Sequence, residues 1–232
     1  MTAQKIGIIG AMAEEIERLH EHVDVTNTFA KAGITYYEGK LHGKPVIYCK
    51  SGVGKVNAAV CTQLLIDAGA DYVLFTGVAG ALDPSLNIGD IVVSSACIQH
   101  DMDCSPLGYK QGEIPFHPNS EFQADPRLIE LAASASERLF PGRCLTGKVL
   151  SGDQFIASRE KVEQLHQALQ GACAEMEGAS VAQVCEMNEV PFVVIRSMSD
   201  KADGSAHVNF ADFTVQASNH SYQIIDDMLK HI

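Results

Sequence analysis

Short apolar segments alternate with amphipathic helical patterns along most of the chain, and this alternation constrains the fold more than any other feature of the sequence. Segment 72–76 is apolar throughout, which is typical of a strand buried on both faces. Strands that alternate with helices form a mostly parallel sheet covered by helices, with ligands bound beyond the carboxyl ends of the strands. We therefore predict a three-layer α/β sandwich, with a central mixed, mostly parallel, twisted sheet flanked by helices.

The individual elements follow from the apolar periodicity and from the capping residues. Strands are predicted at 5–10, 35–39, 45–50, 72–76, 88–98, 144–150, 172–177 and 192–199. Helices are predicted at 14–22, from Gly54 to near Gly69, after Asp125, at 159–168, at 179–187 and after Asn209. Val56, Val60 and Leu64 supply the expected buried face of the second helix, and 77–80 predicts a sharp turn. Residues 100–120 predict a long irregular loop, and such loops are usually functional or intermolecular.

Length and composition predict a single domain that spans residues 1–232. A chain of 232 residues and 25.0 kDa can bury one full core, and 46% hydrophobic with 20% charged residues is typical of a globular protein. The net charge of −12 and the absence of a basic run exclude a nucleic-acid partner on electrostatic grounds. The apolar run 6–12 is too short for a signal peptide or a membrane span, so we expect a cytoplasmic protein with no membrane partner.

The cysteines and the glycine motifs argue against several common sites. Seven cysteines, without CxxC or a Cys/His cluster at zinc spacing, predict buried reduced thiols and no metal. Gly7 and Gly10 do not complete a dinucleotide fingerprint, and Gly54-Lys55 lacks the first glycine and the hydroxyl residue of a phosphate loop. Ser151 and Ser158 lie in no nucleophile elbow.

Acidic residues at the ends of apolar segments are the strongest indication of a site. Glu175 and Glu177 would point to the same side of a strand, and two buried anions need cations or hydroxyl donors. Arg196, on the strand expected beside them, can pair with one, and the vicinal hydroxyls of a ribose can satisfy the other. Asp200 follows four residues later at the end of that strand. The alternative is that these four are surface charges at loop ends, but their convergence at strand ends favours a site.

The sequence resembles the 5′-methylthioadenosine/S-adenosylhomocysteine nucleosidases, within the purine nucleoside phosphorylase-like superfamily. The resemblance runs nearly end to end and is carried by motifs in the same order. These motifs are 6–12 with Glu14-Glu15, then 50–56, Ser151-Gly152-Asp153-Gln154-Phe155, Glu175-Met176-Glu177 and Arg196-Ser197-Met198-Ser199-Asp200.

The resemblance implies hydrolysis of the bond between adenine and a 5′-thio-substituted ribose by water, without metal or cofactor, in methionine salvage and S-adenosylmethionine recycling. Asp200 matches the acid that protonates N7 of the adenine. Glu15 matches the base that activates water, and Glu177 matches the residue that grips the ribose hydroxyls. Arg196 and Glu175 would arrange the water and that carboxylate.

The same resemblance implies the substrate contacts and a homodimer. Phe155 would stack on the purine, with Ile156 contributing backbone contacts, and Met176 would pack against the sugar. The remaining matched binding residues are Met12, Val53 and Phe210 around the thioalkyl group, Ser199, and Cys104, Leu107, Tyr109 and Pro115 in a segment that reaches across a dimer interface. Loop 100–120 would therefore complete the pocket of the partner.

Departures from the family pattern leave alternatives open. Val78 stands where many relatives have serine, and Cys104 and Leu107 differ from the commonest residues at the pocket mouth. The 5′-substituent is therefore open, including 6-amino-6-deoxyfutalosine of menaquinone synthesis. A phosphate-dependent nucleoside phosphorylase would need more cations than Lys50 and Lys55 offer. A non-catalytic nucleoside-binding protein would need no proton donor, and an oxidoreductase is disfavoured by the incomplete glycine motif.

Overall fold

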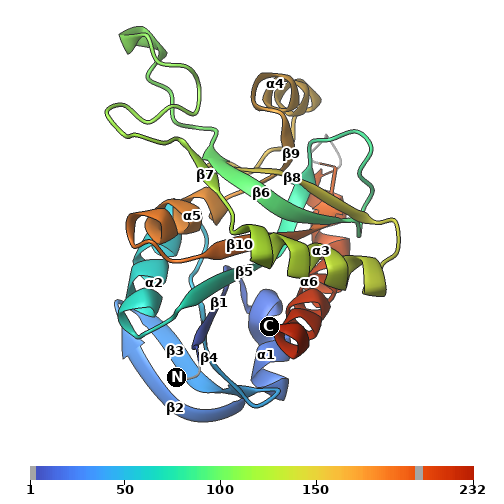
Figure 1. Cartoon of the computed structure of the whole chain (residues 1–232). Coiled ribbons are helices and arrows are strands. Elements are labelled where there is room, and N and C mark those ends of the chain that lie inside the picture. The colour runs from blue at the N-terminus through green and yellow to red at the C-terminus, as the bar shows by residue number, and fades with distance from the viewer. Residues whose placement is uncertain (1–3, 202–205) are drawn as a thin grey trace.

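The protein is built around one ten-stranded mixed sheet (Figure 1). The computed structural model describes residues 4–201 and 206–232, without the side chains of 206–209 and 211. The strands are β1 (Ile6–Gly10), β2 (Asp24–Lys31), β3 (Ile34–Leu41), β4 (Lys44–Lys50), β5 (Tyr72–Ala81), β6 (Ile91–Gln99), β7 (Glu121–Gln123), β8 (Cys144–Ser151), β9 (Gly171–Glu175) and β10 (Phe192–Asp200). The helices are α1 (Ala13–His22), α2 (Lys55–Asp67), α3 (Pro126–Leu139), α4 (Arg159–Leu169), α5 (Gly178–Met187) and α6 (Ala206–His231).

The strand order brings the carboxyl ends of several strands to one place. β1 lies between β4 and β5 and is parallel to both. β5 also pairs in parallel with β10 and antiparallel with β9, and pairings through β6 and β8 join β10 to β9. These strands therefore close into a ring. Antiparallel pairings at β2–β3–β4, β5–β9, β6–β7 and β6–β10 make the sheet more mixed than the sequence suggested.

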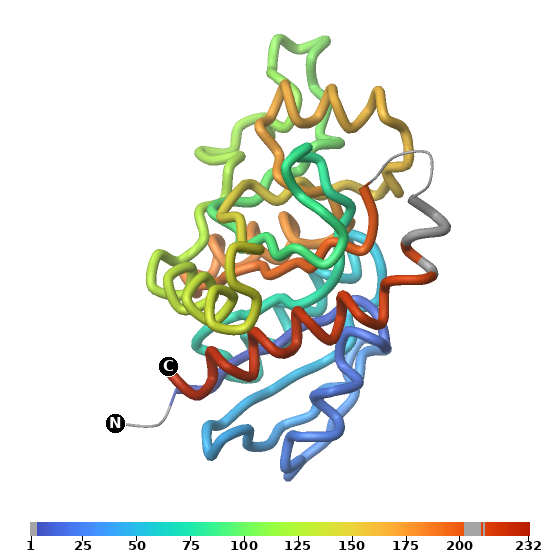
Figure 2. Tube along the Cα trace, turned by 90° about the vertical axis from the view of Figure 1, so that its right-hand side faces the viewer, coloured from blue at the N-terminus to red at the C-terminus, as the bar shows by residue number. Residues whose placement is uncertain are grey.

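Helices cover both faces of the sheet, as predicted. The long helix α6 packs on β5 and β10 between α1 and α3, while α2 and α5 pack together on the other face (Figures 1 and 2). Asp125 caps α3 as expected, because its carboxylate accepts a hydrogen bond from the N–H of Leu128 at 2.9 Å. No helix in the described part of the chain is long and apolar enough to cross a membrane.

Several details differ from the sequence predictions. β2 was not predicted, because nearly all of its side chains are exposed and show no apolar alternation. The buried face of α2 is formed by Ala58, Cys61, Thr62 and Leu65, whereas Val56 and Val60 are exposed. Residues 77–80 form no turn and continue β5. α6 begins at Ala206, so Asn209 lies within the helix rather than at its cap, and its side chain lies outside the described residues.

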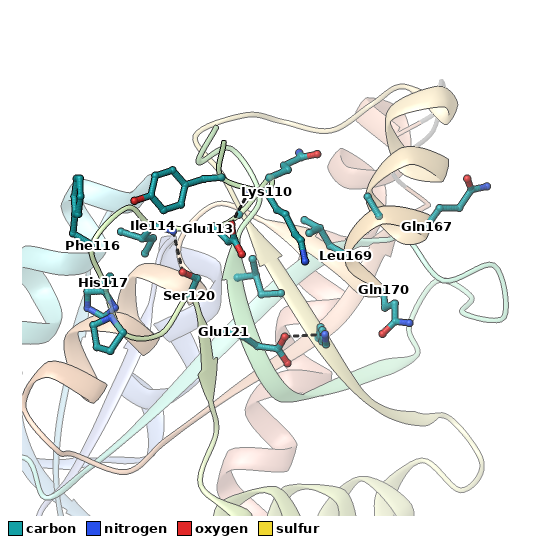
Figure 3. Close-up of a pocket in the computed structure, with 17 residues that line it drawn as sticks. Lys110, Glu113, Ile114, Phe116, His117, Ser120, Glu121, Gln167, Leu169 and Gln170 are labelled. Carbon is teal, nitrogen blue, oxygen red and sulfur yellow. Dashed lines mark hydrogen bonds and ion pairs between the residues drawn. The ribbon is translucent and has the colours of Figure 1, made fainter. Parts of the chain in front are cut away.

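Loop 100–120 extends away from the sheet, as both views show (Figures 1 and 2). It contains a short 3-10 turn at Ser105–Leu107, and it connects the strands β6 and β7. Part of the loop lies over the end of α4 and forms an open pocket with it (Figure 3). Phe116 and Leu107 are 95% and 72% exposed on this loop, which is unusual for large apolar side chains.

Candidate active site

One pocket gathers most of the side chains that the sequence marked as functional. The cavity of about 300 Å³ lies at the carboxyl ends of β1, β5, β9 and β10, where a ligand site was expected. Its lining includes the predicted residues Met12, Glu15, Val53, Phe155, Ile156, Glu175, Met176, Glu177, Ser199, Asp200 and Phe210. Glu15 and Asp200, which are far apart in sequence, therefore face the same cavity.

Glu15 is held by backbone donors from two chain segments. Its Oε2 accepts hydrogen bonds from the N–H groups of Ala11 and Met12 at 2.6 and 2.9 Å, and its Oε1 accepts one from Val78 at 3.1 Å. The side chain is buried. Burial raises the pKa of this carboxyl above its ordinary value, although the nearby Arg196 and the three N–H donors oppose the shift. A raised pKa makes Glu15 a stronger base toward water.

Gly77 lets Glu15 and Arg196 approach the same point of β5. A Cβ at this position would lie 2.4 Å from Oε1 of Glu15 and 2.8 Å from Nη1 of Arg196. Both distances are shorter than van der Waals contact, so only glycine leaves room for the two side chains. The sequence marked this glycine for a turn, but its role is to allow close approach.

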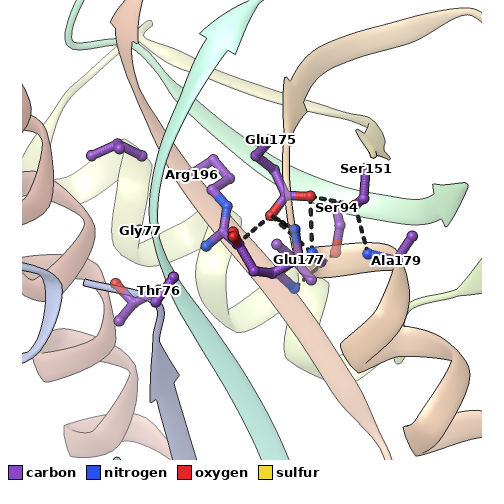
Figure 4. A network of polar contacts seen from close by, with 12 residues as sticks. Thr76, Gly77, Ser94, Ser151, Glu175, Glu177, Ala179 and Arg196 are labelled. Atoms are coloured by element: carbon purple, nitrogen blue, oxygen red, sulfur yellow. Dashed lines mark hydrogen bonds and ion pairs between the residues drawn. The ribbon is translucent and has the colours of Figure 1, made fainter. Parts of the chain in front are cut away.

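Glu175 is the anchor of the polar network (Figure 4). Its carboxylate accepts hydrogen bonds from the N–H groups of Glu177 and Gly178 and from the hydroxyl of Ser151. Nη2 of Arg196 lies 2.6 Å from Oε2 of Glu175. The predicted ion pair is thus confirmed. The two strands are not neighbours, however, because β9 and β10 each pair with β5.

Arg196 lies beneath the pocket. Its side chain is 1% exposed, and its guanidinium carbon stacks 3.9 Å from the centre of the Phe75 ring. The residue does not line the cavity. It can therefore act on a ligand only indirectly, through its ion pair with Glu175 and through its positive charge, which favours the ionised forms of Glu15 and Glu177.

Glu177 is not on a strand, contrary to the prediction. β9 ends at Glu175, and the backbone turns so that Glu177 becomes the N-cap residue of α5. Its Oε1 accepts a hydrogen bond from the N–H of Gly54 at 2.8 Å. Burial, reinforced by the negative charge of Glu175, raises the pKa of Glu177 to about 8. The side chain still faces the pocket, but a turn rather than strand periodicity directs it there.

The stability of Glu177→Gln relative to the wild type is expected to increase as the pH rises. Because folding raises the pKa of Glu177 from 4.5 to about 8, the folded wild type binds an extra proton between these values and loses stability as the pH increases. Glutamine has no proton to lose, so the variant should gain a few degrees in Tm relative to the wild type between pH 4.5 and 8, with no further gain above.

Glu38→Gln is the matched control for this titration. Lys5 and Asn27 donate hydrogen bonds to Glu38 and lower its pKa, so this substitution should cost stability relative to the wild type as the pH rises. Equal pH trends in the two variants would contradict the assignment of Glu177.

Asp200 is the last residue of β10 and lies in the pocket wall. Its side chain is buried, and the hydroxyl of Ser199 donates a hydrogen bond to its Oδ2 at 2.8 Å. The pairing of β10 with β5 shifts register between Met198 and Asp200. This irregularity at the strand end turns Asp200 toward the cavity that Glu15 and Glu177 also line.

Aromatic and aliphatic side chains complete the pocket. The rings of Phe155 and Phe210 meet edge to face with their centres 5.8 Å apart. Phe155 and Val53 are each about half exposed, so the apolar part of the pocket opens to solvent. A flat heterocycle and a short apolar chain would both gain contact area there.

Some predicted residues lie outside this cavity, and one supporting contact was not predicted. Cys104, Leu107, Tyr109 and Pro115 are on loop 100–120 and do not line this cavity. Val78 does line it, but its backbone N–H rather than its side chain holds Glu15. Ser151 holds Glu175 from β8, a contact that no spacing in the sequence indicated. Among the described residues, no cluster of His, Cys, Asp or Glu could hold a metal ion.

Comparison with known proteins identifies the family of this chain. The phosphorylase superfamily, the class that the fold and the pocket define, matches residues 5–230. The 5′-methylthioadenosine/S-adenosylhomocysteine nucleosidase of Shewanella loihica is 44% identical over 98% of this chain and 100% of its own length. The chain belongs to this nucleosidase family.

Solved structures show the same relationship. The nucleosidase of Neisseria meningitidis in complex with methylthio-immucillin-A superposes with a TM-score of 0.94 at 36% identity, covering 99% of this chain and 100% of that chain. The futalosine hydrolase of Helicobacter pylori also superposes with a TM-score of 0.94, at 35% identity, covering 99% of each chain.

Proposed function

We propose that the protein hydrolyses the N-glycosidic bond of 5′-methylthioadenosine and S-adenosylhomocysteine, releasing adenine and the 5′-thio-substituted ribose. The observation that carries the proposal is the convergence of Glu15, Glu177 and Asp200 on one partly apolar pocket. Such a reaction would serve methionine salvage and the recycling of S-adenosylmethionine by-products, in a single-domain cytoplasmic enzyme.

Asp200 acts as the general acid. Adenine is a poor leaving group as an anion, so protonation of N7 lowers the barrier to bond cleavage. Asp200 is buried at the pocket wall, and the adjacent hydroxyl of Ser199 fixes the orientation of its carboxyl. An orientation fixed before binding allows the acid to deliver its proton along one direction.

Glu15 acts as the general base toward water. Three N–H donors fix its carboxylate, and burial makes it more basic than an exposed glutamate. Oε1 retains acceptor capacity for a water molecule beside the sugar. As a proton moves from water to Glu15, the resulting hydroxide can attack C1′ of the ribose.

Glu177 holds the ribose and stabilises the positive charge that develops on it. A sugar that loses its base becomes oxocarbenium-like, and a nearby carboxylate stabilises that state electrostatically. Glu177 must be ionised for this role, and Arg196 favours the ionised form while burial and Glu175 oppose it. The anchored pair of Glu175 and Arg196 keeps these charges in place.

The apolar wall fits the two uncharged parts of the substrate. Phe155 provides a ring face for the purine, and Ile156 is buried beside it. Met12, Val53, Met176 and Phe210 line the same cavity. In this proposal the alkylthio group packs against Met12, Val53 and Phe210, and the sugar packs against Met176. The polar and apolar parts of the pocket thus correspond to the parts of a thio-substituted nucleoside.

We also propose that the protein is a homodimer in which loop 100–120 completes the pocket of the partner. The support is the exposure of Phe116 and Leu107 together with the open side of the pocket at Phe155 and Val53. Sedimentation equilibrium should give twice the chain mass of 25.0 kDa, and Leu107→Asp should lower the affinity for substrate. A fully active monomer would refute this arrangement.

Turnover in the absence of phosphate tests the reaction. Incubation with 5′-methylthioadenosine should release adenine and free methylthioribose at the same rate with and without phosphate. Strict dependence on phosphate would instead support a phosphorylase, and binding without turnover would support a nucleoside-binding protein.

A second candidate substrate is 6-amino-6-deoxyfutalosine. It is favoured by the similarity to the Helicobacter pylori futalosine hydrolase, which superposes as well as the Neisseria meningitidis nucleosidase does. The same catalytic carboxylates would serve, because only the 5′-substituent differs. Measuring kcat/KM for 5′-methylthioadenosine, S-adenosylhomocysteine and 6-amino-6-deoxyfutalosine under identical conditions will rank the three substrates.

A further inference from the structure

Three chain segments meet beside Glu177 in a closed ring of hydrogen bonds. Nζ of Lys55 lies 2.7 Å from Oδ1 of Asp101, and the N–H of Asp153 donates to Oδ2 of Asp101 at 3.0 Å. The ring closes where the N–H of Lys55 donates to Oδ1 of Asp153 at 2.8 Å. Asp101 begins the projecting loop, and Asp153 begins the segment that carries Phe155. The ring therefore ties three loops around the pocket together.

This ring directly adjoins the contact to Glu177 in sequence. Gly54, next to Lys55, donates its N–H to Oε1 of Glu177, and the hydroxyl of Ser180 donates to the carbonyl of Lys55 at 2.8 Å. Gly54 has a φ of +97°, a conformation that glycine adopts with little strain. The amide of Asn57 holds the other side of the peptide that points at Glu177, because it donates a hydrogen bond to the carbonyl of Val53 at 2.7 Å. On the C-terminal side of Gly54, the chain is restrained by the N–H, side chain and carbonyl of Lys55.

The ion pair between Lys55 and Asp101 is largely shielded from solvent. The side chains of Lys55 and Asp101 are 18% and 14% exposed, and Nζ of Lys55 also donates to Gln99 at 3.1 Å. Removing one partner of a shielded pair leaves the other charge without compensation, which destabilises the local arrangement of the three segments. The position of Gly54 should respond, because it adjoins Lys55.

We propose that Lys55 is a positioning residue for the glycosidic reaction, and that its ion pair with Asp101 holds the Gly54 N–H against the ribose-binding carboxylate of Glu177. The expected loss of kcat/KM rests on the proposed function, whereas the expected change in the pKa of Glu177 does not. Lys55 itself does not line the pocket and acts through Gly54 and Glu177.

The charged groups around Glu177 set the sign of the expected effect. Burial, Glu175 and Glu15 raise the pKa of Glu177, whereas the N–H of Gly54 and the charge of Arg196 lower it. Loss of the Gly54 hydrogen bond therefore raises the pKa of Glu177 further. The ionised form, which binds the ribose hydroxyls, then becomes dominant only at higher pH.

The test uses Lys55→Met, the conservative Lys55→Arg and the control Lys5→Met. Lys5 forms a comparable ion pair with Glu38 at 2.8 Å, away from the pocket. The kcat/KM for 5′-methylthioadenosine should fall about 10- to 100-fold in Lys55→Met, the factor expected for one hydrogen bond to a charged group. Lys55→Arg should recover most of this loss, and Lys5→Met should resemble the wild type.

A second measurement is independent of turnover. Titration of ¹³C-labelled glutamate carboxyls by NMR, with Glu177→Gln for assignment, should show a higher pKa for Glu177 in Lys55→Met than in the wild type. If Lys55→Met does not fold, Asp101→Asn should show the same shift. If the pKa of Glu177 is unchanged in the folded variant, the inference is wrong whether or not the activity falls. A raised pKa supports it even if the substrate proves to be another nucleoside.

Discussion

Asp200→Asn is expected to bind 5′-methylthioadenosine nearly as tightly as the wild type and to lose about 10²- to 10⁴-fold in kcat, the usual contribution of a general acid. Asparagine preserves the size of the side chain and its contact with Ser199 but cannot deliver a proton to the purine. Calorimetric binding and steady-state release of adenine measure the two quantities separately. The separation matters because loss of a residue that only holds the substrate would weaken binding and leave kcat at saturation unchanged.

Asp67→Asn provides the control for this substitution. Asp67 is exposed at the end of α2, where it accepts a hydrogen bond from Gln63, so kcat should not change. Wild-type kcat in Asp200→Asn would remove Asp200 from the role of acid. Loss of binding without loss of kcat at saturation would reassign it to substrate binding.

Gly77→Ala is expected to lower kcat/KM by about 10²-fold or more, although it adds a single methyl group outside the pocket lining. The new Cβ would lie 2.4 Å from Oε1 of Glu15 and 2.8 Å from Nη1 of Arg196, so at least one side chain must move. A displacement of about 1 Å in a catalytic group can cost this much in rate. The base and its supporting cation would be disturbed together.

Gly43→Ala separates this local clash from ordinary backbone strain. Gly43 lies in the turn between β3 and β4 with a φ of +76°, and a methyl group added there would meet nothing within 4 Å. Alanine at this position therefore costs stability without touching the pocket. Tm and kcat/KM should be measured for both variants. A catalytic loss of the same size in Gly43→Ala would contradict the assigned role of Gly77.

The sequence predicted the central strands well because burial leaves a strong pattern. β5 and β10 are buried on both faces, and strand ends in an α/β sheet meet at one edge, so Glu177 and Asp200 could be placed in one site from the residues alone. β2 was missed for the opposite reason, since an exposed edge strand has no apolar alternation.

The contacts within the site could not be predicted because they depend on backbone geometry. Strand periodicity placed Glu177 correctly in the pocket for the wrong reason, since the chain turns after Glu175. The ring at Lys55 joins residues 46 and 98 positions apart, and no local pattern records such pairings. Arg196 reaches Glu175 from a strand that does not adjoin β9, which only the ring-like strand order explains.

In the proposed reaction, water activated by Glu15 attacks the sugar while Asp200 protonates the departing base. Turnover of 5′-methylthioadenosine in H₂¹⁸O, followed by mass spectrometry of the sugar under conditions that limit exchange at C1, identifies the attacking nucleophile. The methylthioribose should carry one ¹⁸O, and its rate of formation should fall close to background in Glu15→Gln. Unlabelled sugar, or a sugar phosphate, would contradict the proposed reaction.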